Sequence, residues 1–266
     1  MGSKARNYSQ KTLKRLFGLS ANQCSFPGCR KMLINDKDAG DSNICHIEAA
    51  NADGERYRED MTDKERADFS NLILLCPQHH KETDDVEKYT VNVLKKMKQD
   101  HQSLLLNQKF KSNPSMLSNA ISALADIELD DLAEVESLKS FNPSDKINYN
   151  CIKRNVSVIN EYKVYHTKIN SLYEELEKQG SIKKVKLLRT IRQVYIQVKG
   201  KFVLDSENDL ELVRENSDDI FDAVIDELYH KMEDSSFWEE DIVFSINLIV
   251  VDAFMRCKIL EEPIEV

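Results

Sequence analysis

Two short motifs decide the fold of this chain, CSFPGC at Cys24–Cys29 and CPQH at Cys76–His79. Each motif places a pair of zinc-type ligands on a tight turn, and a structural zinc site is usually assembled from two such pairs. We therefore expect a tetrahedral zinc held by Cys24, Cys29, Cys76 and His79. The alternative is that these cysteines are small buried residues without a metal, but two independent pairs with suitable spacing rarely coincide.

The cysteines and histidines are concentrated around these motifs. Seven of the twelve lie between residues 24 and 80 of a chain of 266 residues. No apolar run approaches the eighteen residues of a membrane span, and the basic N-terminus lacks the apolar core and cleavage site of a secretory signal. We expect no membrane association and a cytoplasmic location, where clustered cysteines favour metal binding over disulfides.

The balance of charge divides the chain into two parts. Residues 1–112 contain 19 Lys and Arg against 16 Asp and Glu, whereas residues 113–266 contain 18 against 30. The net charges are therefore +3 and −12, and the polar, turn-forming stretch Lys111–Ser115 lies at the change. We expect one domain over 1–112 and a second over 113–266.

The expected fold class is α+β, mostly α, because glycine and proline are scarce and apolar residues recur at helical spacing. In the first part, Ser9–Leu19 predicts a short basic helix and Tyr89–Leu106 a helix that closes the domain. Lys31–Ile34 and Ile44–Ile47 are expected to be the two strands of one hairpin. Leu72–Leu75 is expected to form a compact apolar plug.

The second part is predicted to be helical almost throughout. The turn-forming residues Asn142–Ser144 and Gly180 mark boundaries between helices. The expected helices cover approximately residues 116–139, 145–178, 182–203, 208–233 and 239–260. We therefore expect an all-α domain.

Three polar residues close to the zinc motifs complete a known pattern. His46 lies in CHIEAA (Cys45–Ala50), Asn71 precedes LILLC, and His80 follows His79. Over about residues 20–104 the sequence resembles the HNH nucleases, which have a small ββα-metal fold. The resemblance implies a zinc-stapled domain that hydrolyses DNA, in which His46 is the general base that activates water, Asn71 fixes the loop, and His80 binds a catalytic divalent cation.

The identity of that cation depends on two further residues. Asp84 follows His80 by four positions, so on a helix both side chains would face the same way and Asp84 would complete the cation site; the alternative is a solvated acidic turn. Cys45 stands where related sequences often have a metal-binding aspartate or histidine. Because a neutral thiol is a poor magnesium ligand, either the site holds Mg²⁺ with more water or it uses the softer Mn²⁺.

Arg56 lies in the segment between the expected base and the asparagine. Related HNH sequences often have an arginine there, and the resemblance implies that it binds the scissile phosphate of the substrate. The alternative is an ordinary surface arginine among many charges.

The second part carries a resemblance of its own, over about residues 143–262. Its segments PSDKI (Pro143–Ile147), INEY (Ile159–Tyr162), RENSDDIF (Arg214–Phe221) and VVDAFMRCKIL (Val250–Leu260) resemble the C-terminal domain of bacterial ABC three-component systems. The resemblance implies an adaptor that joins an N-terminal effector to an SMC-like or Rad50-like ABC ATPase and a small middle component, in anti-phage defence systems similar to Lamassu. The alternative is an ordinary helical bundle or dimerisation domain.

These inferences combine into one hypothesis: a metal-dependent HNH DNA endonuclease, acting as the effector of a defence complex. The chain lacks a glycine-rich phosphate cradle, so any ATPase would be another subunit. Double-strand cutting needs two sites, which makes a homo-oligomer a further expectation. Two alternatives remain, a zinc-stapled module that binds nucleic acid or protein without cutting, and a stand-alone HNH restriction enzyme. The acidic second part argues against the restriction enzyme, because sequence reading usually needs a basic face.

Overall fold

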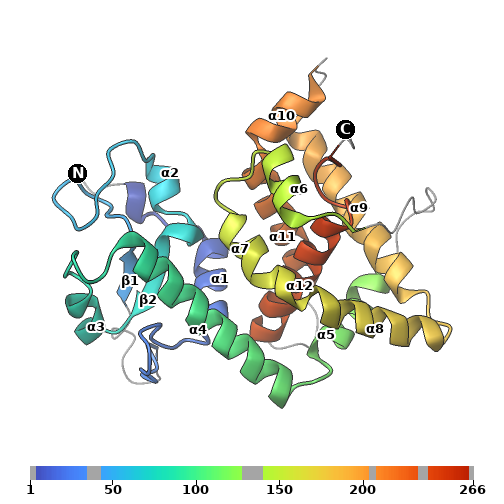
Figure 1. Ribbon diagram of the computed structural model, residues 1–266, viewed down its shortest axis with the longest axis horizontal. Helices are drawn as coiled ribbons and strands as arrows, with labels where there is room; N and C mark the ends of the chain where they lie inside the picture. The colour runs from blue at the N-terminus through green and yellow to red at the C-terminus, as the bar shows by residue number, and fades with distance from the viewer. Residues whose placement is uncertain (1–3, 35–42, 128–139, 204–207, 233–238, 264–266) are drawn as a thin grey trace. The chain divides into compact units, whose positions relative to one another are not determined.

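The computed structural model describes residues 4–34, 43–127, 140–203, 208–232 and 239–263 (Figure 1). The chain folds into two compact units, Met1–Ser112 and Asn113–Val266. Each is described by itself below, as unit 1 and unit 2.

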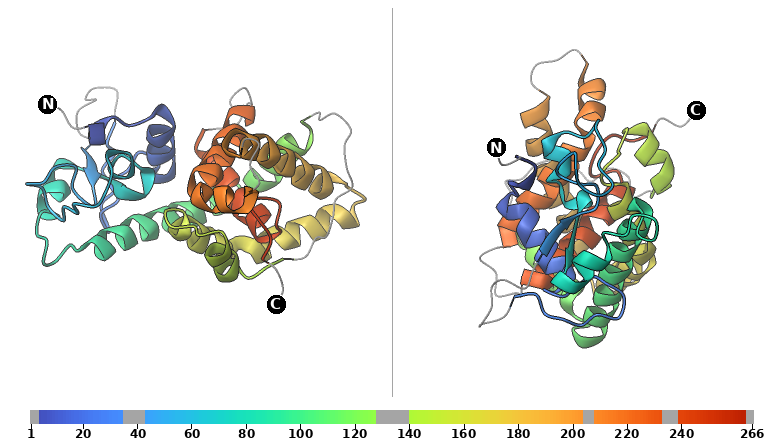
Figure 2. Two further views of the ribbon diagram at one scale, coloured as in Figure 1. Left: turned by 90° about the horizontal axis from the view of Figure 1, so that it is seen from above. Right: turned by 90° about the vertical axis from the view of Figure 1, so that its left-hand side faces the viewer.

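Unit 1 is built on a two-stranded antiparallel sheet. Its elements in chain order are η1 (Lys4–Arg6), α1 (Gln10–Ser20), β1 (Asn43–His46), α2 (Asp63–Arg66), η2 (Phe69–Asn71), β2 (Leu72–Leu75), α3 (Pro77–Glu82) and α4 (Val91–Ser112). Strand β1 pairs with β2, so that His46 lies opposite Leu72, and the two strands run side by side in Figure 2. Helices α1 and α3 pack against β2, and α4 packs against α1.

The predicted hairpin between Lys31–Ile34 and Ile44–Ile47 is wrong. The partner of Ile44 is Leu74 in β2, which was expected to be an apolar plug, while Met32 forms only an isolated bridge with Gln23. The physical reason is burial. All four residues of β2 are buried, whereas Met32 and Ile34 are 47% and 43% exposed. A fully buried strand must satisfy its backbone groups, and pairing with β1 supplies the hydrogen-bond partners that β2 needs.

Unit 2 is helical, which confirms the mostly α composition expected from the sequence. Its elements are α5 (Met116–Ala125), α6 (Pro143–Tyr149), α7 (Val156–Tyr162), η3 (Lys163–Tyr165), α8 (His166–Lys178), α9 (Lys183–Phe202), α10 (Asp209–Glu215), α11 (Ser217–Met232) and α12 (Glu239–Met255). Gly180, with φ of +74°, separates α8 from α9 as expected. The helix predicted over 116–139 is too long, because α5 ends at Ala125 with Asp126 as its C-cap residue; residues 128–139 of that range lie outside the described residues.

Two of the predicted long helices are interrupted. The range 145–178 breaks after α6, where Cys151 has φ of +55° and the backbone N–H groups of the next turn bind the Asp218 carboxylate. The range 208–233 breaks at Asn216, whose side chain donates to the carbonyl of Leu212 at 2.8 Å. Polar side chains that bond to backbone groups compete with the helix in this way, and periodicity alone does not reveal it.

Helix α12 lies at the centre of unit 2, where it contacts α5, α7, α8, α9 and α11 (Figure 1). Its C-terminal end is fixed by Lys146 of α6. The ammonium group of Lys146 is fully buried and donates to the carbonyls of Phe254 at 2.6 Å and Ile259 at 2.8 Å. Burial lowers the pKa of Lys146 to about 8. A buried lysine thus caps carbonyls at the end of the central helix.

Replacing Lys146 should destabilise unit 2 markedly. Lys146→Met keeps the length of the side chain but leaves two buried carbonyls without their donor, so we expect a loss of about 2–3 kcal/mol in the free energy of unfolding, measured by urea denaturation. Lys201→Met, which removes a surface ion pair with Glu227, is the matched control and should change little. Equal effects of both substitutions would contradict the capping role.

Candidate functional site

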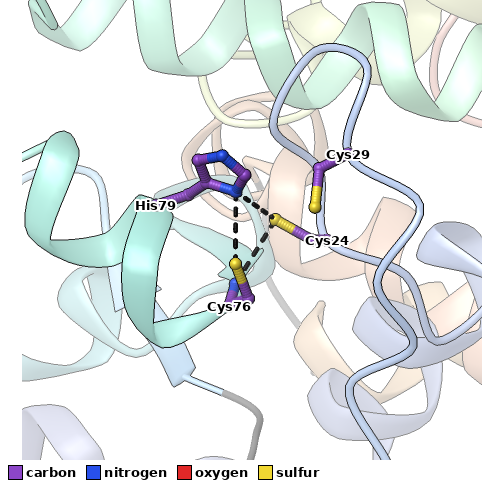
Figure 3. A group of neighbouring side chains, drawn as sticks. All are labelled: Cys24, Cys29, Cys76 and His79. Carbon is purple, nitrogen blue, oxygen red and sulfur yellow. Dashed lines mark hydrogen bonds between the residues drawn. The ribbon is translucent and has the colours of Figure 1, made fainter.

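Four side chains of unit 1 converge on one point (Figure 3). Cys24, Cys29, Cys76 and His79 place their ligand atoms within 4.8 Å of one another. His79 Nδ1 lies 3.2 Å from Cys76 Sγ and 3.5 Å from Cys24 Sγ. Three sulfurs and one imidazole nitrogen are the donor set of a structural zinc site, and ligand atoms at this spacing fit around one tetrahedral ion. The group coincides with the set expected from the sequence.

Local backbone structure brings the two ligand pairs together. Gly28 has φ of +77°, a conformation that favours glycine, and it turns the chain between Cys24 and Cys29. The N–H of Ser25 donates to the carbonyl of Leu74 at 2.9 Å, which ties this turn to strand β2. Cys76 follows β2 directly and is the N-cap residue of α3, so His79 comes back over it on the first helical turn.

The His79 ring is also held by stacking. Phe26 lies parallel to it, with ring centroids 3.9 Å apart and an interplanar angle of 3°. This contact fixes the ring plane while leaving Nδ1 directed at the cysteines. The cluster is therefore preorganised by packing as well as by the turns.

A cavity of about 570 Å³ lies in unit 1, lined by residues other than the four of the cluster. Four of the residues selected from the sequence line it: His46, Arg56, His80 and Asp84. Cys45 lines it too, and burial raises the pKa of its thiol, which keeps it a neutral and poor ligand for a hard cation. The structure thus gathers the predicted chemistry of unit 1 around one cavity.

His46 is oriented by a backbone carbonyl. Its Nε2 lies 3.0 Å from the carbonyl oxygen of Ala5, which can only accept, so Nε2 carries the proton and Nδ1 keeps its lone pair. Burial is the main cause that lowers the pKa of His46 below its usual 6.5, although the bond to Ala5 opposes this shift. His46 is therefore neutral at pH 7 and has a free basic nitrogen.

Asn71 does not line the cavity but fixes the loop that follows His46. Its side-chain oxygen accepts from the N–H of Glu48 at 2.9 Å, and its amide donates to the carbonyls of Glu48 at 2.9 Å and Arg66 at 3.0 Å. Its own carbonyl accepts from the N–H of Ile47 at 2.8 Å. Only 2% of Asn71 is exposed, so replacing this amide would leave buried backbone groups without partners.

His80 and Asp84 both line the cavity, but His80 lies on a helix and Asp84 lies in a turn. His80 is on α3, but α3 ends at Glu82, so the expected arrangement of both residues on one helix is wrong. The N–H of Thr83 donates to the carbonyls of His79 and His80, and this tightened last turn sends Asp84 into a turn instead. An imidazole and a carboxylate suit Mg²⁺ or Mn²⁺. Among the described residues, no third cysteine, histidine or carboxylate joins them in a metal-binding group.

Arg56 bridges three backbone segments. Its Nε donates to the carbonyl of Ile47 at 2.8 Å, and its Nη1 donates to the carbonyls of Thr83 at 2.9 Å and Tyr89 at 3.1 Å. Burial lowers its pKa, but an arginine stays charged at any ordinary pH. Of the donor nitrogens of Arg56, only Nη2 is left for a ligand. The main role of Arg56 that the structure shows is to position the loop.

The sequence did not indicate several residues that build the site. Arg66 is buried and donates to the carbonyl of Ala49 at 2.7 Å, and Glu48 is 6% exposed beside Lys95 and Arg58. The capping box between Thr62 and Glu65 was a readable signal for the short helix that carries Arg66. The approach of Ala5 to His46 has no comparable signal, because the contact joins residues 41 positions apart.

Comparison with known proteins identifies unit 2. Residues 115–261 match the family described as C-terminal domain 10 of the ABC-three component (ABC-3C) systems. The chain belongs to this family. It is thus a component of a multi-subunit ABC-3C system of anti-phage defence. No curated protein and no solved structure matches the chain.

Of the helices in the described ranges, none combines the length and the apolarity that a bilayer crossing needs.

Metal analysis tests the four-residue cluster directly. We expect about one zinc ion per chain in the purified protein, released by a chelator with loss of the thermal stability of unit 1. Cys29→Ala should remove the zinc with little loss of packing, because Cys29 is half-exposed. Cys151→Ala, at an exposed cysteine of unit 2, should retain it. Wild-type protein with no stoichiometric metal would contradict the assignment.

Proposed function

We propose that this chain is the nuclease effector of its ABC-3C system. Unit 1 is a metal-dependent HNH DNA endonuclease, and unit 2 binds the partner subunits. One observation carries the proposal: His46, His80 and Asp84 line a single cavity in the same unit as a separate four-ligand cluster. A module that only bound DNA or protein would need the cluster for stability but would have no use for the additional histidines and carboxylate.

The residues of the cavity have distinct roles in this proposal. Nδ1 of His46 takes a proton from water, the resulting hydroxide oxygen attacks phosphorus, and the bond to the leaving oxygen breaks as that oxygen takes a proton from solvent. Asn71 and Arg56 hold the loops on either side of His46 in place. A divalent cation held by His80 and Asp84, Mg²⁺ or Mn²⁺, would stabilise negative charge on the phosphate and the leaving oxygen.

Unit 2 supplies attachment rather than chemistry. With 30 acidic and 18 basic residues, the range 113–266 repels DNA, so a protein partner suits it better than a second DNA contact. We propose that the partners are an SMC-like or Rad50-like ABC ATPase and a small middle component, in a system similar to Lamassu. ATP hydrolysis by those subunits would then control when unit 1 cuts.

The general base is tested by substitution. His46→Ala should lower the nicking rate of supercoiled plasmid at least about 100-fold, because it removes the group that accepts the proton from water. The full chain is assayed in Mg²⁺ and in Mn²⁺, alone and with the other components of its system. His230→Ala, at an exposed histidine of unit 2, is the matched control and should cut normally. A His46→Ala protein that still cuts plasmid would show that the base lies elsewhere.

The dependence of the rate on pH gives a second, independent test. Because burial lowers the pKa of His46, the base becomes protonated only below pH 6.5. The nicking rate should therefore be flat near pH 7 and above, and should fall through a midpoint below 6.5 as the pH decreases. The midpoint is measured at several concentrations of Mn²⁺, because a midpoint that moves with the metal concentration would report protonation of a metal ligand instead.

A further inference from the structure

The residues that precede α1 form one wall of the cavity. Arg6 and Tyr8 both line it, and Ala5, the middle residue of η1, is fully buried. The carbonyl of Ala5 holds Nε2 of His46, and η1 packs against α2. The segment is also closed on itself, since the N–H of Asn7 donates to the carbonyl of Lys4 at 2.9 Å. Lys4–Tyr8 is therefore a fixed part of the site.

Arg6 is the positively charged residue of this wall whose guanidinium N–H groups are available to a ligand. Its side chain is exposed, and within the described residues it makes no hydrogen bond or ion pair. Arg56, by contrast, spends its Nε and Nη1 donors on three carbonyls. The charge of Arg6 is close enough to act on both His46 and Tyr8, although burial is the larger influence on the pKa of each. The guanidinium of Arg6 thus offers its N–H donors to the cavity near His46, the proposed base.

Tyr8 adds a second donor next to Arg6. Its hydroxyl lies 3.5 Å from Nε2 of His46, and the two rings are 5.8 Å apart. Because Nε2 carries the proton that it donates to Ala5, the Tyr8 hydroxyl has no lone pair to donate to at that nitrogen. Its O–H hydrogen therefore remains available to an acceptor in the cavity.

We propose that Arg6, assisted by Tyr8, binds a phosphate of the DNA strand at the cleavage site, in the place that the sequence had suggested for Arg56. This inference rests on the proposed nuclease function. A guanidinium that presents parallel N–H groups matches two phosphate oxygens, and the tyrosine hydroxyl supplies a third bond. Since Ala5 immediately precedes Arg6 and carries the carbonyl that orients His46, one short segment positions both the substrate and the base.

Lys4 provides a matched control for Arg6. Both residues belong to η1 and both are exposed, but Lys4 does not line the cavity. Arg6→Gln and Lys4→Gln therefore remove the same charge from the same element, and neither residue contributes to the core. Thermal melts of the full-length variants check that both remain folded.

Two measurements on the full chain test the proposal. The first is the rate of plasmid nicking at several DNA concentrations, where Arg6→Gln should lower kcat/KM about tenfold or more, Arg6→Lys should recover part of the loss, and Lys4→Gln should match wild type. The second is binding to a short DNA duplex at several salt concentrations, in a His46→Ala background that cannot cut. There, Arg6→Gln should weaken binding and reduce the salt slope by about one phosphate contact, and Tyr8→Phe should weaken binding less.

The outcomes separate this inference from the proposed function. If wild type cuts DNA and Arg6→Gln behaves like Lys4→Gln in both measurements, the assignment of Arg6 is wrong while the nuclease stands. If wild type neither cuts nor binds DNA with its partner subunits present, both proposals fail. A loss confined to Arg6→Gln, with rescue by lysine, supports the phosphate site.

Discussion

The pairing of strand β2 with β1 is the constraint on which unit 1 depends. The strand has only four residues, Leu72–Leu75, and all are buried. Such a short, fully buried strand must have its backbone groups satisfied on both edges. One edge pairs with β1, which ends at His46, and the other accepts the N–H of Ser25 at Leu74. Asn71 lies at its start and Cys76 at its end, so the position of the strand determines both the cavity and the metal cluster.

This dependence explains which parts of the site the sequence could predict. The four ligands Cys24, Cys29, Cys76 and His79 were accessible because each pair is local and its spacing has a direct geometric meaning. His46 and Asn71 came from a resemblance and not from spacing. The strand partner was missed because a hairpin between neighbouring segments looks as plausible in sequence as a pairing across 26 residues, and only the burial of β2 decides between them.

Two details of the site that the sequence did not reveal depend on backbone carbonyls. Arg56 was expected at a phosphate, yet carbonyls of Ile47, Thr83 and Tyr89 take three of its donors. Asp84 was expected on a helix that ends two residues earlier. Carbonyls are present at every residue and leave no trace in a side-chain pattern, so their partners emerge only when the chain is folded.

In unit 2, a network of buried polar side chains helps to determine how the helices pack. Asp252, on the central helix α12, accepts from the Tyr173 hydroxyl at 3.2 Å and from Arg256 Nε at 3.0 Å, and lies 2.8 Å from His166 Nδ1. Such a network adds little to the net free energy of folding. An alternative packing that leaves one of its members buried without a partner is, however, strongly destabilised. Together with Lys146 the network specifies how α12 sits among helices of otherwise ordinary apolar and acidic sequence. A domain with a uniquely packed core and an acidic surface suits a role in which it presents a stable face to partner subunits. Under the proposed function, the modest net charge of +3 on residues 1–112 would then give weak DNA binding on its own, so that cutting depends on DNA being delivered by the assembled complex.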